Sequence, residues 1–201
     1  MKVSAIRRLI CLAAICAAAQ GVSLAQAGAQ PAAQTPAQTP AEVAASGGRV
    51  KLGDGRVSFV PPAGFRRLTE EEVALKFARG NRPQYVFADE TMKTSVAVSF
   101  SDARLSPGDL AEYRLAMESM LPRMIPGLKW LERNFVEIGG RRWLHLEMTS
   151  SAVDTDIHNH LYSTSFDGRA IIFGFNSTVG EYPKMKDALE KSALSVELQD
   201  R

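Results

Sequence analysis

Four strand-like segments that follow one another between residues 129 and 176 constrain the fold of this 201-residue chain most strongly. Two of the three joints between them are glycine turns, Gly139-Gly140 and Asp167-Gly168. Joints this short favour antiparallel pairing, because parallel strands need a crossover of about a dozen residues or more. The segments, which predict an antiparallel meander, are Lys129–Ile138, Arg141–Ser150, Ile157–Phe166 and Arg169–Asn176.

The second of these segments alternates between two sets of side chains. Successive side chains of a strand point to opposite faces of the sheet. Leu144, Leu146 and Met148 therefore share one face. The opposite face receives Trp143, His145, Glu147 and Thr149. This strand thus presents an apolar set to one side and a mixed set to the other.

Three helices are predicted to cover the sheet, and the first of them has a well-defined start. Thr69 is its N-cap, with Glu72 as the partner in a capping box. Leu68 and Val73 occupy the positions of a hydrophobic staple. The pair Gly80-Asn81 is expected to end this helix.

The second predicted helix begins at Ser106-Pro107, with serine as the N-cap and proline in the first turn. Its apolar stripe comprises Leu110, Tyr113, Met117, Leu121 and Met124, and the pattern is typical of a core-facing helix. Pro122 and Pro126-Gly127 are expected to break it. The third helix is expected at about residues 181–192.

Shorter strand segments complete the pattern at residues 49–52, 56–60, 84–89, 94–101 and 194–198. The order of elements is then β-β-α-β-β-α-β-β-β-β-α-β. The predicted fold class is α+β, with a largely antiparallel β-sheet flanked by helices in an α/β/α sandwich.

Residues 1–27 have the parts of a secretory signal peptide. Lys2, Arg7 and Arg8 form a basic start, residues 9–19 form a short apolar core, and Ala25-Gln26-Ala27 is a cleavage signal. The apolar run is too short for a membrane span. We therefore expect cleavage after Ala27 and a periplasmic or secreted protein with no transmembrane segment in the mature chain.

Processing changes the composition of the chain. Cys11 and Cys16 leave with the signal peptide, so the mature chain has neither a thiol nucleophile nor a disulfide. Three of the 24 basic residues leave as well, and the remaining 21 face 22 acidic residues. The resulting net charge of about −1 speaks against nucleic acid as a partner, which calls for an excess of basic residues.

The mature chain divides into two parts. Residues 28–48 are dominated by Ala, Gln, Pro and Thr and have too few large apolar side chains to form a core, so we expect a disordered linker. Residues 49–201 are expected to form a single α+β domain, because about 150 residues bury roughly two thirds of their surface.

Common catalytic motifs are missing from the sequence. It has no phosphate-binding loop, dinucleotide-binding fingerprint, serine nucleophile elbow or zinc-protease helix. These absences remove the commonest classes of hydrolase and nucleotide-binding enzyme. We expect a protein that is not an enzyme and that has no cofactor, with Zn²⁺ or Mn²⁺ at the metal-type ligands described next as the alternative.

Metal-type ligands gather in one stretch. Asp154, Asp156, His158 and His160 alternate along the chain, so a strand would place all four on one side. Imidazole and carboxylate ligands suit Zn²⁺, Mn²⁺ or Cu²⁺. Neighbours on one side of a strand lie about 7 Å apart, which allows two of these residues, and not four, to bind one ion.

Two further ligands on the preceding strand, His145 and Glu147, are placed to converge on the same ion. The alternative interpretation is a polar turn followed by a strand with a solvated face.

A second candidate site is the basic and aromatic group Arg141, Arg142 and Trp143, which faces Arg133 across the predicted hairpin. It is suited to an anionic group or a protein partner. The alternative is a solvated hairpin edge.

Several segments resemble the PsbP/DcrB-like family of exported α+β proteins. They are Phe59–Phe65, Val98–Phe100, Gly139–Trp143, Tyr162–Thr164 and Ile172–Phe175. The resemblance covers residues 50–198 and implies an antiparallel sheet between helices in a small, extracytoplasmic, mostly non-enzymatic protein. Plant members of the family assist the oxygen-evolving complex. No motif in this chain carries that role over, and no functional residues are transferred.

The leading hypothesis is an exported, non-catalytic binding or accessory protein of the bacterial envelope, acting through a protein partner. The first alternative is a metal-binding protein or metal-dependent enzyme that uses Asp154–His160 to bind Zn²⁺ or Mn²⁺. The second alternative is a binder of small ligands with a pocket between a helix and the sheet.

Overall fold

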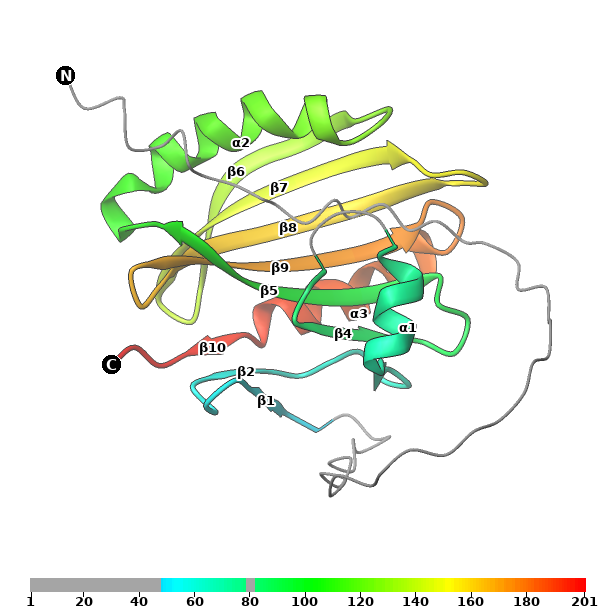
Figure 1. Ribbon diagram of the computed structural model, residues 1–201, viewed down its shortest axis with the longest axis horizontal. Helices are drawn as coiled ribbons and strands as arrows, with labels where there is room; N and C mark the ends of the chain where they lie inside the picture. The colour runs from blue at the N-terminus through cyan, green and yellow to red at the C-terminus, as the bar shows by residue number, and fades with distance from the viewer. Residues whose placement is uncertain (1–47, 79–81) are drawn as a thin grey trace, which may run out of the picture.

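The computed structural model describes residues 48–78 and 82–201 (Figure 1). The predicted signal peptide, nearly all of the predicted linker and the expected helix stop at Gly80-Asn81 lie outside these residues. Within the described residues, no helix is long and apolar enough to cross a membrane.

Seven strands form the main sheet in the order β3-β4-β5-β9-β8-β7-β6, and each neighbouring pair is antiparallel. Their bounds are β3 Arg66–Arg67, β4 Tyr85–Ala88, β5 Thr94–Arg104, β6 Lys129–Ile138, β7 Arg141–Ser151, β8 Asp156–Phe166 and β9 Arg169–Thr178. The predicted meander is confirmed as β6 to β9.

The meander continues into the first half of the chain through β9, which pairs with β5 as well as with β8. Val96 lies opposite Phe175 and Val98 opposite Phe173 in this pairing. Strands β8 and β9 are therefore interior strands of the sheet, and nearly all their side chains are buried.

Three short strands form a second sheet, in the order β1-β2-β10. Strands β1 (Val50–Leu52) and β2 (Val57–Phe59), which were predicted as segments 49–52 and 56–60, form a hairpin, and β10 (Glu197–Leu198) adds the end of the chain to it. The expected single sheet is thus divided in two, and β3 is a two-residue strand that was not expected.

Helices lie on both faces of the main sheet. α1 (Glu70–Lys76) crosses in front of β4 and β5, whereas α3 (Tyr182–Leu194) lies behind the sheet (Figure 1). α2 (Leu110–Met124) follows a single 3-10 turn, Pro107–Asp109, and packs on the meander. This arrangement confirms the α+β class and the α/β/α layers.

The alternation in β7 determines which helix covers which face. Leu144, Leu146 and Met148 pack in one core with the α2 stripe residues Leu110, Tyr113, Met117 and Leu121. Trp143 belongs to the opposite core, which contains Leu189 and Ala193 of α3. A strand-level pattern of period two thus directs α2 and α3 to opposite sides of the sheet.

The helix signals are confirmed at α1 and partly wrong at α2. Thr69 and Glu72 form both hydrogen bonds of the capping box. At α2, Pro122 does not break the helix, which continues to Met124. Proline lacks one backbone donor, but in the last turn this removes a single hydrogen bond, and Ile125 closes the helix through its bond to the carbonyl of Leu121. Met124 is partly exposed and leaves the stripe.

Candidate metal centre

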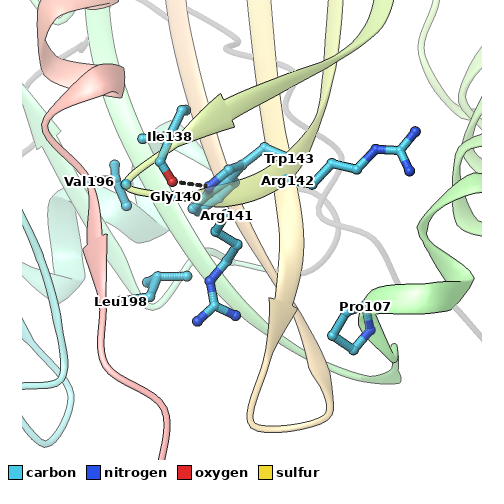
Figure 2. A pocket seen from close by; sticks show the side chains of 9 residues that line it. Pro107, Ile138, Gly140, Arg141, Arg142, Trp143, Val196 and Leu198 are labelled. Carbon is cyan, nitrogen blue, oxygen red and sulfur yellow. Dashed lines mark hydrogen bonds between the residues drawn. The ribbon is translucent and has the colours of Figure 1, made fainter.

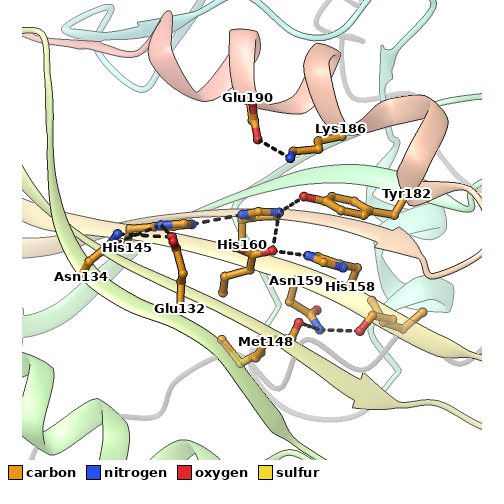
Figure 3. Close-up of polar contacts among 12 residues, drawn as sticks. Glu132, Asn134, His145, Met148, His158, Asn159, His160, Tyr182, Lys186 and Glu190 are labelled. Atoms are coloured by element: carbon orange, nitrogen blue, oxygen red, sulfur yellow. Dashed lines mark hydrogen bonds and ion pairs between the residues drawn. The ribbon is translucent and has the colours of Figure 1, made fainter.

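A group of polar residues is buried between the meander and the start of α3 (Figure 3). We call it the histidine cluster and define it as His145 and Glu147 of β7, His158 and His160 of β8, and Tyr182 of α3. The three histidines are buried, with exposed fractions of 6% for His145, 8% for His158 and 5% for His160. Imidazole groups this buried need partners for their ring nitrogens.

The pairing of β7 with β8 positions four of these side chains. Glu147 lies directly opposite His160, and Thr149 lies opposite His158. The polar contacts run diagonally across this register. His145 Nε2 is 3.0 Å from His160 Nδ1, and His158 Nε2 is 2.7 Å from Glu147 Oε1. A third approach, 3.8 Å from His160 Nε2 to the same Glu147 oxygen, joins the two diagonals.

Tyr182 is the contribution of α3 to the cluster. Its hydroxyl oxygen lies 2.9 Å from His160 Nε2. Its ring stacks on His158 with 3.5 Å between the ring centroids and 10° between the ring planes. The sequence analysis did not identify Tyr182 as a site residue. Strand β9 separates β8 from α3 along the chain, and no local pattern indicates that the start of α3 packs against His158 and His160.

Burial lowers the pKa values of His145 and His160 and so favours their unprotonated forms near neutral pH. Desolvation lowers the pKa of His160 to about 4, against a partial opposing effect of the Glu147 charge. Desolvation also lowers the pKa of His145. A neutral imidazole has a lone pair on one ring nitrogen, which is the form that binds metals.

The charges around the cluster are mainly negative. Glu147 belongs to the cluster, Glu132 reaches to 3.6 Å from His145 Nδ1, and Glu190 faces the cluster from α3. Lys186 is the cation on α3 that faces it, and it lies 3.8 Å from Glu190. Burial and the carboxylates raise the pKa of Tyr182 to about 12. Such surroundings favour a bound cation.

Three ligands of the cluster come close enough together to hold a metal ion. His145, Glu147 and His160 each offer one ligand atom, and these atoms lie within 4.8 Å of one another. Within residues 48–78 and 82–201, one group of three or more metal-type ligands lies within such distances, and it consists of these three residues. Two imidazoles and a carboxylate form a common ligand set for transition metals.

The structure brings together a different set from the four ligands predicted in Asp154–His160. His160 belongs to the group, and His158 forms a hydrogen bond with Glu147, which is the carboxylate of the group. Asp154 and Asp156 are exposed and lie outside the group. The reason is position along the strand: Asp154 precedes β8 and Asp156 is its first residue, whereas His145 and Glu147 approach from β7. The register between β7 and β8 brings His145 and Glu147 close to His160.

The basic and aromatic group at the β6–β7 hairpin has to be corrected in one respect. Trp143 is only 1% exposed, and its indole nitrogen donates to the carbonyl of Ile138 at 3.3 Å. It is a core residue and cannot meet a partner at the surface. Arg142 lies over the ring of Phe135 at 3.9 Å. Arg141 donates to the carbonyl of Ser165 at 2.8 Å and pairs with Asp200.

A depression of about 350 Å³ lies beside this hairpin (Figure 2). Its walls include Pro107, Gly140, Arg141, Val196 and Leu198. These residues come from the hairpin, the 3-10 turn and the region of β10, so this depression is not the predicted pocket between a helix and the sheet.

Comparison with known proteins supports the fold. No family model and no curated protein matches the chain. Among solved structures, cyanobacterial PsbP (CyanoP) from Synechocystis sp. PCC 6803 superposes with a TM-score of 0.58 at 15% identity, over 81% of this chain and 98% of that one. A crystal structure from Bacteroides thetaiotaomicron gives 0.53 at 13% identity, over 78% of this chain and 50% of that one. The chain therefore has the PsbP-like α+β fold, as its sequence resemblance implied.

Proposed function

We propose that this chain is an exported, non-catalytic accessory protein of the bacterial envelope that binds a divalent transition-metal ion in the histidine cluster. The observation that carries the proposal is the convergence of His145, Glu147 and His160 within 4.8 Å in a buried site. The export signal and the absence of catalytic motifs in the sequence support the remaining parts.

The distances suit a metal of the zinc class. Bonds of about 2.0–2.2 Å in a tetrahedral site place ligand atoms roughly 3.3 Å apart. The 3.8 Å approach of Glu147 Oε1 to His160 Nε2 is close to that value. Small side-chain rotations therefore suffice to admit an ion. Glu147 and Tyr182 are only partly buried, so the cluster can be reached from solvent.

The alternative for these contacts is a set of hydrogen bonds that serves stability alone. Three buried imidazoles beside carboxylates are an expensive way to stabilise a sheet face, because apolar residues would fill it without desolvating polar groups. We therefore favour a ligand-binding role.

Metal binding can be tested on the processed chain, purified from the envelope fraction and stripped with a chelator. Cobalt serves as a spectroscopic probe, since a low-coordinate buried site gives a much stronger visible absorption than hydrated cobalt. We expect one cobalt ion per chain and its displacement by zinc. His160→Gln should abolish the absorption while the protein remains folded, as measured by circular dichroism.

The matched control is the double variant Asp154→Asn and Asp156→Asn, which removes the two exposed carboxylates of the sequence-predicted set. It should bind cobalt like the unaltered chain. Binding that depends on these two residues and not on His160 would overturn the assignment. A wild-type chain that takes up no metal would overturn the function.

The accessory role is tested separately by chemical crosslinking in intact envelopes. We expect one defined crosslinked species between this chain and another envelope protein. A chain that stays uncrosslinked at its native level would contradict that role without affecting the metal site.

A further inference from the structure

The hydrogen bonds of the cluster determine which nitrogen of His160 is free. Asn134 Nδ2 donates to Glu132 Oε2 at 3.2 Å, so the carbonyl oxygen of the same amide faces His145. That oxygen accepts from His145 Nδ1–H at 3.1 Å. His145 Nε2 consequently has a lone pair, which accepts from His160 Nδ1–H. The His160 lone pair is left on Nε2.

The geometry of the two rings agrees with this sequence of donors and acceptors. The planes of His145 and His160 differ by only 5°, so the N–H group of one ring points along the lone pair of the other. His145 therefore orients His160 in the way that partners beyond the ligands fix the tautomer of a metal-binding histidine.

The Nε2 atom of His160 points to the hydroxyl group of Tyr182 (Figure 3), and it also approaches Glu147. Tyr182 Oη is 2.9 Å away, and Glu147 Oε1 is 3.8 Å away. An ion bound at His160 Nε2 would therefore have both oxygens within reach, and it would leave the hydrogen bond between His145 and Asn134 undisturbed.

We propose that Tyr182 is a direct metal ligand, as its phenolate, and that the site therefore also takes ferric iron. The inference rests on the proposed metal-binding function, and it assigns Tyr182 as the third ligand in place of His145, which orients His160. Phenolate and carboxylate are hard anionic oxygens, which favour hard cations of high charge. On binding, the phenol proton is released to solvent, an iron–oxygen bond forms, and the iron remains ferric.

The surroundings of Tyr182 support an anionic oxygen once a cation is present. Tyr182 is the first residue of α3, where the helix dipole stabilises negative charge. Its stacking on His158 holds the ring in place, so the hydroxyl group is aimed at His160 before any ion arrives. The carboxylates of Glu147 and Glu190 add the negative charge that a trivalent ion offsets.

Titration of the metal-free chain with ferric nitrilotriacetate tests the assignment. Ferric phenolates have a visible charge-transfer absorption that imidazole and carboxylate ligands do not give. We expect this band in the wild-type chain and its loss in Tyr182→Phe. The same variant should keep cobalt binding, because His160 and Glu147 are unchanged.

Tyr162→Phe is the matched control, since Tyr162 stacks on His145 at 4.5 Å but lies on the far side of the His145–His160 pair from Tyr182. It should keep the band. A band that survives in Tyr182→Phe, or a wild-type chain that binds cobalt and gives no ferric band, would overturn the role of Tyr182 and leave the proposed function standing. Failure of the wild-type chain to bind cobalt as well as iron would overturn both.

Discussion

His160 on β8 and Tyr182 on α3 share a hydrogen bond of 2.9 Å although they are 22 residues apart in the chain. The bond joins the centre of the sheet to the first turn of the helix behind it. It also connects a histidine that the sequence singles out to a tyrosine that it does not.

This bond should contribute measurably to the stability of the metal-free protein. Tyr182→Phe removes one hydroxyl group and keeps the ring that stacks on His158. A hydrogen bond of this kind contributes about 1 kcal/mol, so the melting temperature should fall by roughly 2–4 °C in the presence of a chelator. An unchanged melting temperature would show that the hydroxyl group is bonded equally well to water.

The metal-free protein should lose stability as the pH falls below neutral. His160 has a pKa near 4 in the folded chain and about 6.5 when unfolded, so the unfolded state binds more protons between these values. Stability due to this group is therefore present above pH 6.5 and is lost progressively as the pH falls. The loss is of order 3 kcal/mol by pH 4.

Urea unfolding at a series of pH values between 4 and 7 measures this effect. The control is His160→Gln, which cannot titrate and should show a clearly smaller change over the same range. An equal pH dependence in the two proteins would assign the effect to other groups.

Trp143 and Arg142 should respond very differently to truncation, although they are neighbours in the sequence. Trp143→Ala leaves a cavity in the core under α3 and should cost about 3–5 kcal/mol in the free energy of unfolding. Arg142→Ala removes a partly exposed contact with Phe135 and should cost about 1 kcal/mol or less. Denaturant unfolding of both variants measures this. Comparable small losses would mean that Trp143 is not a core residue.

The start of α1 provides a test of local structure. Thr69→Ala removes the side-chain oxygen that accepts from the backbone of Glu72, and should cost about 1 kcal/mol. Thr69→Ser keeps that oxygen and is the control. If both variants unfold at the same denaturant concentration, the capping bond contributes nothing.

Export makes a prediction outside the described residues. The processed chain should begin at Gly28, because we propose Ala25-Gln26-Ala27 as the cleavage signal. Mass spectrometry of the protein from the envelope fraction measures its start. A cytoplasmic chain that retains Met1 would contradict the export hypothesis.

The elements and their faces could be read from the sequence because they depend on local chemistry. The capping box of Thr69 and Glu72, the turns at Gly139-Gly140 and Asp167-Gly168 and the alternation in β7 all involve residues within a few positions of each other. Pro122 was misjudged, since its effect depends on how near the helix end it falls, and Met124 and the unexpected strand β3 are two further departures.

Distant pairings were not accessible in this way. Nothing local specifies that β9 pairs with β5, or that the residues before Phe59 meet those after Val196 in a second sheet. The exposure of side chains also depends on distant packing. The sequence predicts Trp143 as part of a surface patch, but α3 and the second sheet cover it.

Local patterns of residues predict most strands and helices, the alternating faces and the residue types from which a metal site can be made. Which of these residues meet depends on the packing of the whole chain. His160 lies between residues of β7 and α3 because strand register and helix packing place them there, and both arise from the burial of apolar faces. Asp154 and Asp156 are closer to His160 in sequence than His145 and Tyr182 are, yet they lie at the start of β8, away from the cluster.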